Sequence, residues 1–236
     1  MTVSDDNTPS SSAAAGVVRL FPLPNLVLFP HVVQPLHIFE PRYCDMLEDA
    51  LAGDKLIAMV LLEPGWESDN EGRPALAPVA CLGKIMAHER LPTGRHNILL
   101  RGMRRAAIRR ELPPRTSFRQ AEVDVLEDFY PASSGTRLRK VQRQLVSLAR
   151  KLLPDSDALH EQLDELLANA ASLGMLTDIF AFTLGFPTDI KQRLLAEWNV
   201  ERRATLLMEK LSVLAERMES PAPSEASDFP PRFSLN

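Results

Sequence analysis

The spacing of hydrophobic residues changes near residue 131 of this chain. Before it, short apolar runs are separated by turn residues, which is typical of strands. Pro41–Ala52 differs, because its apolar residues recur at the spacing of one helix face and Gly53 follows as a terminating residue. The pattern therefore predicts short strands around one helix, closed or nearly closed into a barrel. The strand candidates are Val17–Leu20, Leu26–Leu28, Val32–Phe39, Lys55–Leu62, Leu76–Glu89, His96–Arg101, Met103–Leu112 and Phe118–Leu126.

Glycines punctuate the later strands. Leu91–Gly94 (LPTG) is typical of a hairpin turn. Gly83 predicts a β-bulge, and Gly102 predicts a bend between His96–Arg101 and the strand that follows.

After residue 131 the apolar residues recur at helical spacing, which predicts helices alone. The expected helices are Arg137–Leu153, Leu159–Leu173, Leu176–Leu184, Pro187–Trp198 and Val200–Met218. The expected fold class is therefore α+β, with a β-barrel half (17–130) followed by an α-helical bundle (131–218). The Ser- and Ala-rich residues 1–16 and the Pro-rich residues 219–236 are expected to be disordered tails.

Prolines interrupt the apolar stretch Leu20–Tyr43 at short intervals. A proline fixes its own φ and lacks a backbone donor, so none fits the middle of a central strand or helix. The stretch therefore predicts short, kinked strands followed by a helix that begins with a proline. The prolines are Pro22, Pro24, Pro30, Pro35 and Pro41.

Three groups of residues, in order along the chain, resemble the N-terminal domain of Lon-type ATP-dependent proteases. The first is Phe21-Pro22-Leu23, Val27, Phe29-Pro30 and Pro35-Leu36, similar to the family signature LPL-x-x-x-V-x-F-P-x-x-x-x-P-L. The second is Gly83 with Ile85, Leu91-Pro92-x-Gly94, and Leu100 with Gly102 before an arginine-rich strand. The third is Leu176-Thr177-Asp178, Ala181, Leu184, Pro187, Lys191-Gln192, Leu194-Leu195 and Val200–Arg203. The resemblance covers residues 17 to about 215, and His37–Tyr43 (HIFEPRY) is similar to short, stand-alone bacterial members.

This resemblance implies a PUA-like barrel, a helical domain, and recognition of unfolded or damaged polypeptides. In complete proteases, ATPase and Ser-Lys peptidase modules follow this region. Here the Gly83-Lys84 pair is followed by Ile85 in a strand, so no phosphate-binding loop is expected. The expectation is a non-catalytic protein without cofactors that binds polypeptides in protein quality control, as an adaptor or modulator of ATP-dependent proteolysis. Its clients, a protease partner and a homo-oligomeric state stay open.

Five apolar residues near the barrel edge are candidate polypeptide contacts. An exposed patch of such side chains marks a binding surface, and an open strand edge adds extended segments through main-chain bonds. The alternative is structural: Phe29 and Phe39 fit a core, and Trp66 fits either a partner anchor or packing over the barrel mouth. The five candidates are Phe21, Leu23, Phe29, Phe39 and Trp66.

Positive charge concentrates between Lys84 and Arg119, where ten Lys or Arg residues stand against Glu89 and Glu111. Because PUA-like barrels in other proteins bind RNA, an RNA-binding module is the alternative function, with phosphate contacts from these strands. The stripe lacks interleaved aromatic residues for base stacking, so the simpler interpretation is a solvated strand face that pairs with the acidic first half of the chain or with the helices. A basic groove for acidic peptides is a further alternative. The candidate basic surface is Arg101, Arg104, Arg105, Arg109 and Arg110, with Arg115 nearby.

Length and composition exclude several other classes of protein and of site. The chain has 236 residues and a net charge of −4, and no apolar run is long enough to span a membrane. The N-terminus lacks the apolar core of a secretory signal, so the cytoplasm is the expected location. Cys44 and Cys81 are expected to be buried free thiols. The five histidines lack metal-ligand spacing, so no metal site is expected.

Overall fold

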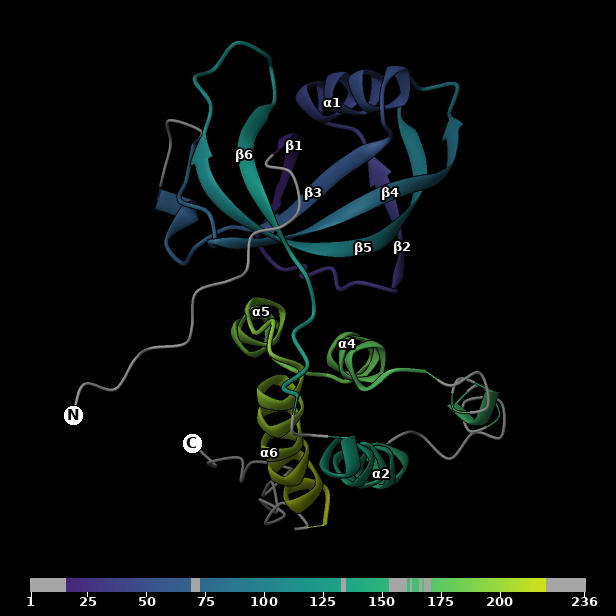
Figure 1. Cartoon of the computed structure of the whole chain (residues 1–236). Coiled ribbons are helices and arrows are strands. Elements are labelled where there is room, and N and C mark those ends of the chain that lie inside the picture. Colours follow the sequence, from purple (N-terminus) through teal and green to yellow (C-terminus); the bar gives the residue numbers. More distant parts are fainter. Residues whose placement is uncertain are drawn as a thin grey trace, which may run out of the picture.

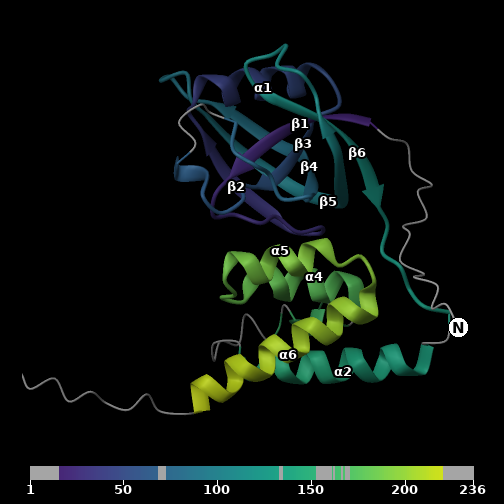
Figure 2. The same cartoon turned by 90° about the vertical axis from the view of Figure 1, so that its left-hand side faces the viewer.

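A computed structural model describes residues 16–68, 73–132, 135–152, 161, 163–165, 167 and 171–219. The strands lie in one half and the later labelled helices lie below them, with α4 and α5 nearest the sheet, while α1 lies over the sheet on the opposite side (Figures 1 and 2). The expected α+β class, sheet first and helices second, is confirmed. The strands are β1 (Gly16–Leu23), β2 (Val33–Ile38), β3 (Leu56–Leu61), β4 (Val79–Arg90), β5 (His96–Glu111) and β6 (Arg119–Leu126). The helices are α1 (Pro41–Ala52), the short 3-10 helix η1 (Trp66–Ser68), α2 (Gly135–Leu152), α4 (Leu173–Thr183), α5 (Thr188–Ala196) and α6 (Val200–Glu219).

The sheet has the order β2-β5-β4-β3-β1-β6, and an additional pairing of β5 with β6 closes it into a barrel. Strand β5 makes this closure possible because it is long. One of its edges pairs with β4, while the other pairs first with β2 and then with β6. The β3–β4 pairing reaches only Lys84. As a result β2, the first half of β5 and the second half of β4 extend beyond the closed barrel.

The barrel interior is filled by small and branched apolar side chains, which allow the strands to close tightly. A larger apolar cluster lies outside the barrel and joins the sheet to α1 and to the C-terminal helices. Helix α1 contributes Tyr43, Met46, Leu47 and Ala50 to that cluster, all on one face, as its spacing predicted. The interior residues are Val18, Leu20, Ala58, Val60, Ala80, Leu82, Ala106, Ala121 and Val123.

The prediction of a strand at Leu26–Leu28 is wrong: the chain there has no regular structure and crosses β5 at Gly102. His31 N donates to Gly102 O over 2.9 Å, and Gly102 N donates to Val32 O over 2.8 Å. A Cβ on Gly102 would lie 2.0 Å from the carbonyl oxygen of Phe29, so this crossing requires glycine. His31 turns the chain with a φ of 68°.

The prediction that Gly102 separates two strands is also wrong, since β5 is continuous from His96 to Glu111. The expected irregularity at Gly83 is present, because the β4–β5 register shifts between Leu82 and Gly83 and leaves Met103 unpaired. A second shift, between Ile85 and Ala87, leaves Met86 unpaired. Both shifts are β-bulges of the kind that bends a strand without ending it.

Helix α4 begins at Leu173, three residues earlier than the predicted Leu176. The side chain of Ser172 accepts a hydrogen bond from Met175 N over 3.1 Å and caps the helix start. Leu173 therefore begins a helix instead of ending the predicted helix Leu159–Leu173. Most of that helix falls on residues 153–170, many of which lie outside the described residues.

A buried group of two arginines and two aspartates joins the barrel to the helices. Arg105 on β5 forms a two-pronged ion pair with Asp178 on α4, and its Nη1 lies 3.1 Å from Asp178 Oδ2. Arg203 on α6 donates to Asp128, just after β6, with Nη2–Oδ2 at 2.8 Å. Arg203 Nε also lies 3.5 Å from Asp178 Oδ1, and Arg105 Nη1 lies 3.3 Å from Asp128 Oδ1. Two positive charges are thus balanced by two negative ones.

Burial makes this group of charges important for the free energy of unfolding. The side chains of Arg105, Asp178 and Arg203 are at most 2% exposed, so water cannot replace a lost partner. Burial alone would lower the pKa of Arg105, but the charges of Asp178 and Asp128 outweigh it and raise the pKa. The guanidinium therefore stays charged, and removing one carboxylate leaves a buried positive charge without compensation.

We expect Asp178→Asn to lower the free energy of unfolding by about 3–5 kcal/mol, the cost of breaking a buried ion pair from one side. Chemical denaturation followed by circular dichroism measures the change. Glu127→Gln is the matched control, because it also replaces a carboxylate by the corresponding amide. Glu127 pairs with Arg104 at the surface, and both side chains are more than half exposed. Its effect should stay within about 1 kcal/mol. Equal losses in the two variants would contradict the role given to Asp178.

Candidate functional site

The structure separates the five sequence-predicted contacts into three groups. Phe21 and Phe29 are 4% and 0% exposed, so their prediction as polypeptide contacts does not fit the fold: both belong to the core. Leu23 and Trp66 are half-buried and line the same hollow. Phe39 is 60% exposed, so its alternative interpretation as a core residue is wrong.

Leu23 and Trp66 lie at a hollow of about 370 Å³ between the end of β1, the start of α1 and η1. Its wall is rich in prolines, whose rings fix their own φ angles. Opposite charges balance around it, with Arg42 bonded to Glu40 over 2.8 Å. The hollow can accept an apolar side chain between balanced charges. Its other lining residues are Pro22, Pro24, Tyr43, Leu62, Glu67, Pro74 and Arg119.

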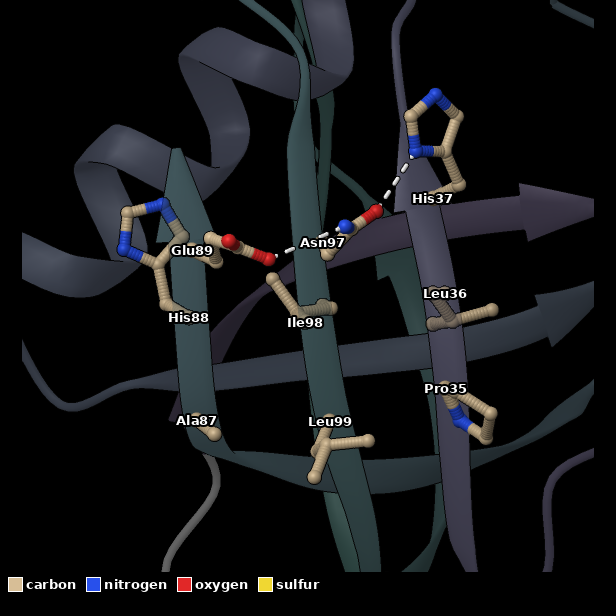
Figure 3. Close-up of a pocket in the computed structure, with 9 residues that line it drawn as sticks. All are labelled: Pro35, Leu36, His37, Ala87, His88, Glu89, Asn97, Ile98 and Leu99. Carbon is tan, nitrogen blue, oxygen red and sulfur yellow. Dashed lines mark hydrogen bonds between the residues drawn. The ribbon is translucent and has the colours of Figure 1, made fainter. Parts of the chain in front are cut away.

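A second and larger hollow, of about 530 Å³, lies on the part of the sheet that extends beyond the barrel (Figure 3). Side chains alternate between the two sides of a strand, and the register aligns them in rows across β2, β5 and β4. One side packs toward α1 and the core. We call the other side the open face. It consists of Val33, Pro35 and His37 on β2, Asn97, Leu99 and Arg101 on β5, and Lys84, Ala87 and Glu89 on β4.

A row of polar side chains crosses the outer end of the open face. His37 Nδ1 lies 2.8 Å from Asn97 Oδ1, and Asn97 Nδ2 donates to Glu89 Oε2 over 3.3 Å (Figure 3). Because the Asn97 amide nitrogen donates to Glu89, its oxygen accepts from His37, which places the proton of His37 on Nδ1. These bonds fix the orientation of the row before any ligand arrives.

The middle of the open face is apolar and exposed to solvent. Leu99, in the middle row, is 42% exposed, and Pro35 and Ala87 lie on either side of it in the register. Val33, in the next row toward the barrel, is 50% exposed. Met86, the bulged residue of β4, is 55% exposed beside them. Phe39 extends this surface, with its ring stacked against that of His37 at a centroid distance of 6.0 Å. Contiguous exposed apolar residues of this kind mark a binding surface.

The outer edge of β2 is less suited to binding than the face. Gly102 N donates to Val32 O, so the alternation of the antiparallel ladder turns the backbone of Pro35 outward. Pro35 has no N–H, and its carbonyl oxygen already accepts from Gln34 Nε2 over 2.8 Å. Strand addition at this edge, which the sequence suggested as a binding mode, therefore lacks part of its main-chain partners.

On the reverse side of the same strands, His88 Nε2 lies 2.7 Å from His96 Nδ1, and the two rings stack. His96 is buried toward α1. Burial first, and then the positive charges of His88 and Arg90, lower the pKa of His96, while Glu48 of α1 opposes them. His96 therefore favours its neutral form in the folded protein.

The basic stripe is mostly an ion-paired strand face. Its exposed arginines Arg104, Arg109 and Arg110 pair with acidic residues of β6 or directly after it, and not with the acidic first half or the helices that the simpler interpretation named. Arg104 pairs with Glu127, and the remaining pairs join β5 to the acidic side chains of β6. Arg105 is the exception, because it is buried in the joint to the helices and is not a surface residue. Arg101 belongs to the open face. The β5–β6 pairs are Arg109 with Asp124 and Arg110 with Glu122.

Within the described part of the chain, no group of three or more His, Cys, Asp or Glu side chains is arranged to hold a metal ion. Cys81 is buried and Cys44 is half-buried, and both are free thiols. Burial raises the pKa of each, which suppresses the reactive thiolate. None of the described helices is long and apolar enough to cross a membrane.

Comparison with known proteins decides the family. A profile of the ATP-dependent protease La (LON) substrate-binding domain matches residues 17–213. The chain belongs to this family. It is 25% identical over 203 residues to a Lon protease of Cytophaga hutchinsonii, covering 86% of this chain and 25% of that protein. A Lon protease of Roseiflexus castenholzii is 28% identical over 204 residues, covering 86% of this chain and 24% of that protein. This Lon-type chain thus spans about a quarter of the length of these relatives.

Solved structures of Lon N-terminal domains share the fold. The N-terminal domain of a Mycobacterium avium complex Lon protease aligns with a TM-score of 0.65 at 16% identity, covering 84% of this chain and 98% of that one. A Lon N-terminal domain protein from Xanthomonas campestris gives a TM-score of 0.58 at 22% identity, covering 82% and 98%. The likeness confirms the architecture that the sequence motifs implied.

Sequence reasoning found Phe39, which adjoins the open face, and Arg101 of the face itself as part of the basic stripe, but it missed the apolar residues of the face. The missing residues, among them Leu99 and Val33, lie in strands whose alternation was visible in the sequence. Which side of these strands α1 covers was not visible, because that depends on packing between elements.

The lowered pKa of His96 predicts a loss of stability in mild acid. Below the ordinary pKa of 6.5 the unfolded chain takes up a proton on His96 that the folded protein resists, so the free energy of unfolding falls as the pH drops through this window. Denaturation at about pH 7.5 and about pH 5.5 measures the change. His96→Gln should show a smaller loss than the wild type.

His31→Asn is the control, because it removes an exposed histidine outside the pair, and asparagine tolerates the positive φ of this position. This variant should keep the wild-type dependence on pH. If His96→Gln loses as much stability in acid as the wild type, His96 is not the group responsible.

Proposed function

We propose that this protein binds unfolded or damaged polypeptides without catalysing a reaction, through the open face and the hollow at Leu23 and Trp66. The observation that carries the proposal is the exposed apolar centre of the open face in a chain that belongs to the Lon substrate-binding domain family. Unfolded chains expose the aliphatic and aromatic side chains that such a surface takes out of water.

The two surfaces lie on either side of the corner that connects β2 to α1. Phe39 adjoins the open face, and the next residue, Glu40, lines the hollow. A polypeptide segment long enough to pass this corner would contact both. Two weak sites on one extended ligand increase the overall affinity without requiring a defined sequence.

The finer role we propose is that of an adaptor or modulator of ATP-dependent proteolysis, which delivers bound polypeptides to a protease. Its support is the match to a substrate-binding domain together with relatives that are themselves named Lon proteases. The cytoplasmic location stays a prediction. The basic stripe gives little support to the RNA-binding alternative. Arg105 is buried, and the charges of Arg104, Arg109 and Arg110 are compensated by ion pairs.

Replacing Phe39 and Leu99 together by serine should weaken polypeptide binding by about fivefold or more, because each side chain then buries less apolar area on the ligand. The measurement is fluorescence anisotropy with labelled, reduced and carboxymethylated α-lactalbumin, which cannot refold. Both residues are exposed, so the midpoint of thermal unfolding should change little.

Val213→Ser provides the matched control, since Val213 is 47% exposed on α6, away from the sheet. This variant should bind like the wild type. Wild-type affinity in the Phe39/Leu99 double variant would exclude the open face, and no binding by the wild type would reject the proposed function.

A non-catalytic binder should hydrolyse neither ATP nor casein. The purified chain, incubated with each, is expected to release no phosphate and no peptides above the level of a heat-denatured sample. Turnover that follows the protein through every purification step would contradict this prediction. The Phe39/Leu99 double variant, purified in the same way, is the control for contamination. Casein hydrolysis by a contaminating protease would be equally strong in preparations of this variant.

A further inference from the structure

Two positive side chains lie side by side on the open face. Lys84 on β4 and Arg101 on β5 are direct cross-strand partners in the register, and both are exposed. Opposed residues of this kind have Cβ atoms about 5 Å apart, where like charges destabilise a sheet. Across the part of the chain that the structure describes, neither side chain has an acidic partner within 4.0 Å.

The next exposed arginines along β5 differ from Lys84 and Arg101, because their charges are compensated by nearby carboxylates. Arg104, Arg109 and Arg110 each pair with an acidic side chain, two of them on the neighbouring strand β6. Lys84 and Arg101 instead face each other beside an apolar surface, with Val33 as the third member of their row. The pair therefore forms a concentrated positive site at the inner end of the open face.

The opposite end of the open face carries a negative charge. Glu89 lies in the outer row with Asn97, four residues before Arg101 along β5. At about 3.3 Å per residue the two rows are about 13 Å apart, with the apolar row of Leu99 midway between them. The face thus presents a positive, an apolar and a negative zone in sequence.

We propose, resting on the polypeptide binding proposed above, that the open face selects segments in which an Asp or Glu side chain lies two residues from an apolar residue. The apolar side chain covers Leu99, and the carboxylate lies between Lys84 and Arg101. The guanidinium of Arg101 donates in the plane of the carboxylate, while the ammonium of Lys84 adds a second charge. Binding relieves the repulsion between the two cations.

The arrangement favours an acidic polypeptide over a nucleic acid. A continuous polyanion that passes along the face would meet the carboxylate of Glu89 about 13 Å from the cation pair. The surface between the two ends offers aliphatic residues, with Phe39 at its margin, and not the aromatic platforms that stack bases. A polypeptide segment can instead match all three zones with side chains of different kinds.

The test compares short fluorescein-labelled peptides, blocked at both ends, in which one Glu, one Gln or one Lys lies two residues from a leucine and the other positions are Ser or Thr. At low salt the wild type should bind the Glu peptide about tenfold more tightly than the Gln peptide, the effect of one charge-assisted hydrogen bond. Added salt should reduce this difference. In Lys84→Glu/Arg101→Glu the preference should reverse toward the Lys peptide.

Arg139→Glu/Arg143→Glu is the matched control. It changes the net charge equally on an exposed part of α2, and it should keep the preference for Glu. Lys84→Gln/Arg101→Gln provides a milder variant, in which the Glu and Gln peptides should bind alike. This variant adds no charge to the sheet, so the test does not depend on the folding of the reversed variant.

Distinct outcomes separate the two proposals. Equal binding of Glu and Gln peptides by the wild type overturns the selectivity and leaves polypeptide binding intact. A Gln peptide that gains tight binding only when its C-terminus is a free carboxylate overturns it in favour of chain ends. Competition by a single-stranded oligonucleotide that is lost in Lys84→Gln/Arg101→Gln overturns it in favour of nucleic acid. Failure of all peptides and of unfolded α-lactalbumin to bind rejects both proposals.

Discussion

The charge balance among Arg105, Asp128, Asp178 and Arg203 is the constraint on which the rest of the structure depends. These residues come from β5, the segment after β6, α4 and α6, so that a single buried group holds the end of the barrel against two helices. Ion pairs at a surface contribute little, but here three of the four side chains have no access to water. A sliding of the helices over the barrel would separate buried charges. The joint therefore fixes one relative position of the two halves more strictly than apolar packing alone would.

Strand β5 carries this constraint to the open face. The same continuous strand places Arg105 in the joint, Gly102 beneath the crossing chain, and Arg101 and Leu99 on the exposed surface. The crossing at Gly102 leaves no space for a side chain, so the register of β5 against the segment before β2 is fixed within a few residues of the face. The register next to the open face is thus fixed by the backbone, and a ligand bound as proposed would find its rows of side chains already in place.

The sequence predicted the order of elements well because periodicity and prolines act locally. It could not predict which arginine of the stripe is buried, since the partner Asp178 lies 73 residues away from Arg105 in the chain. For the same reason it could not separate Phe29, which α1 and the sheet enclose, from Phe39, which they leave exposed. Several residues that carried the family resemblance, among them Asp178 and Arg203, prove to be the ones that join the two halves. Gln192 acts likewise, because its Nε2 donates to Val79 O of β4 over 2.8 Å.

Pro35 has a consequence for how such a surface can exist at high concentration in a cell. A protein that displays aliphatic side chains next to an unpaired strand risks joining its own copies, edge to edge, into ladders that grow without limit. A missing donor and an occupied carbonyl at the centre of β2 interrupt that growth at its first step, while the adjoining surface stays accessible. If the open face binds polypeptides as proposed, Pro35 thereby limits growth through the edge of β2 while the face beside it can still take up other chains.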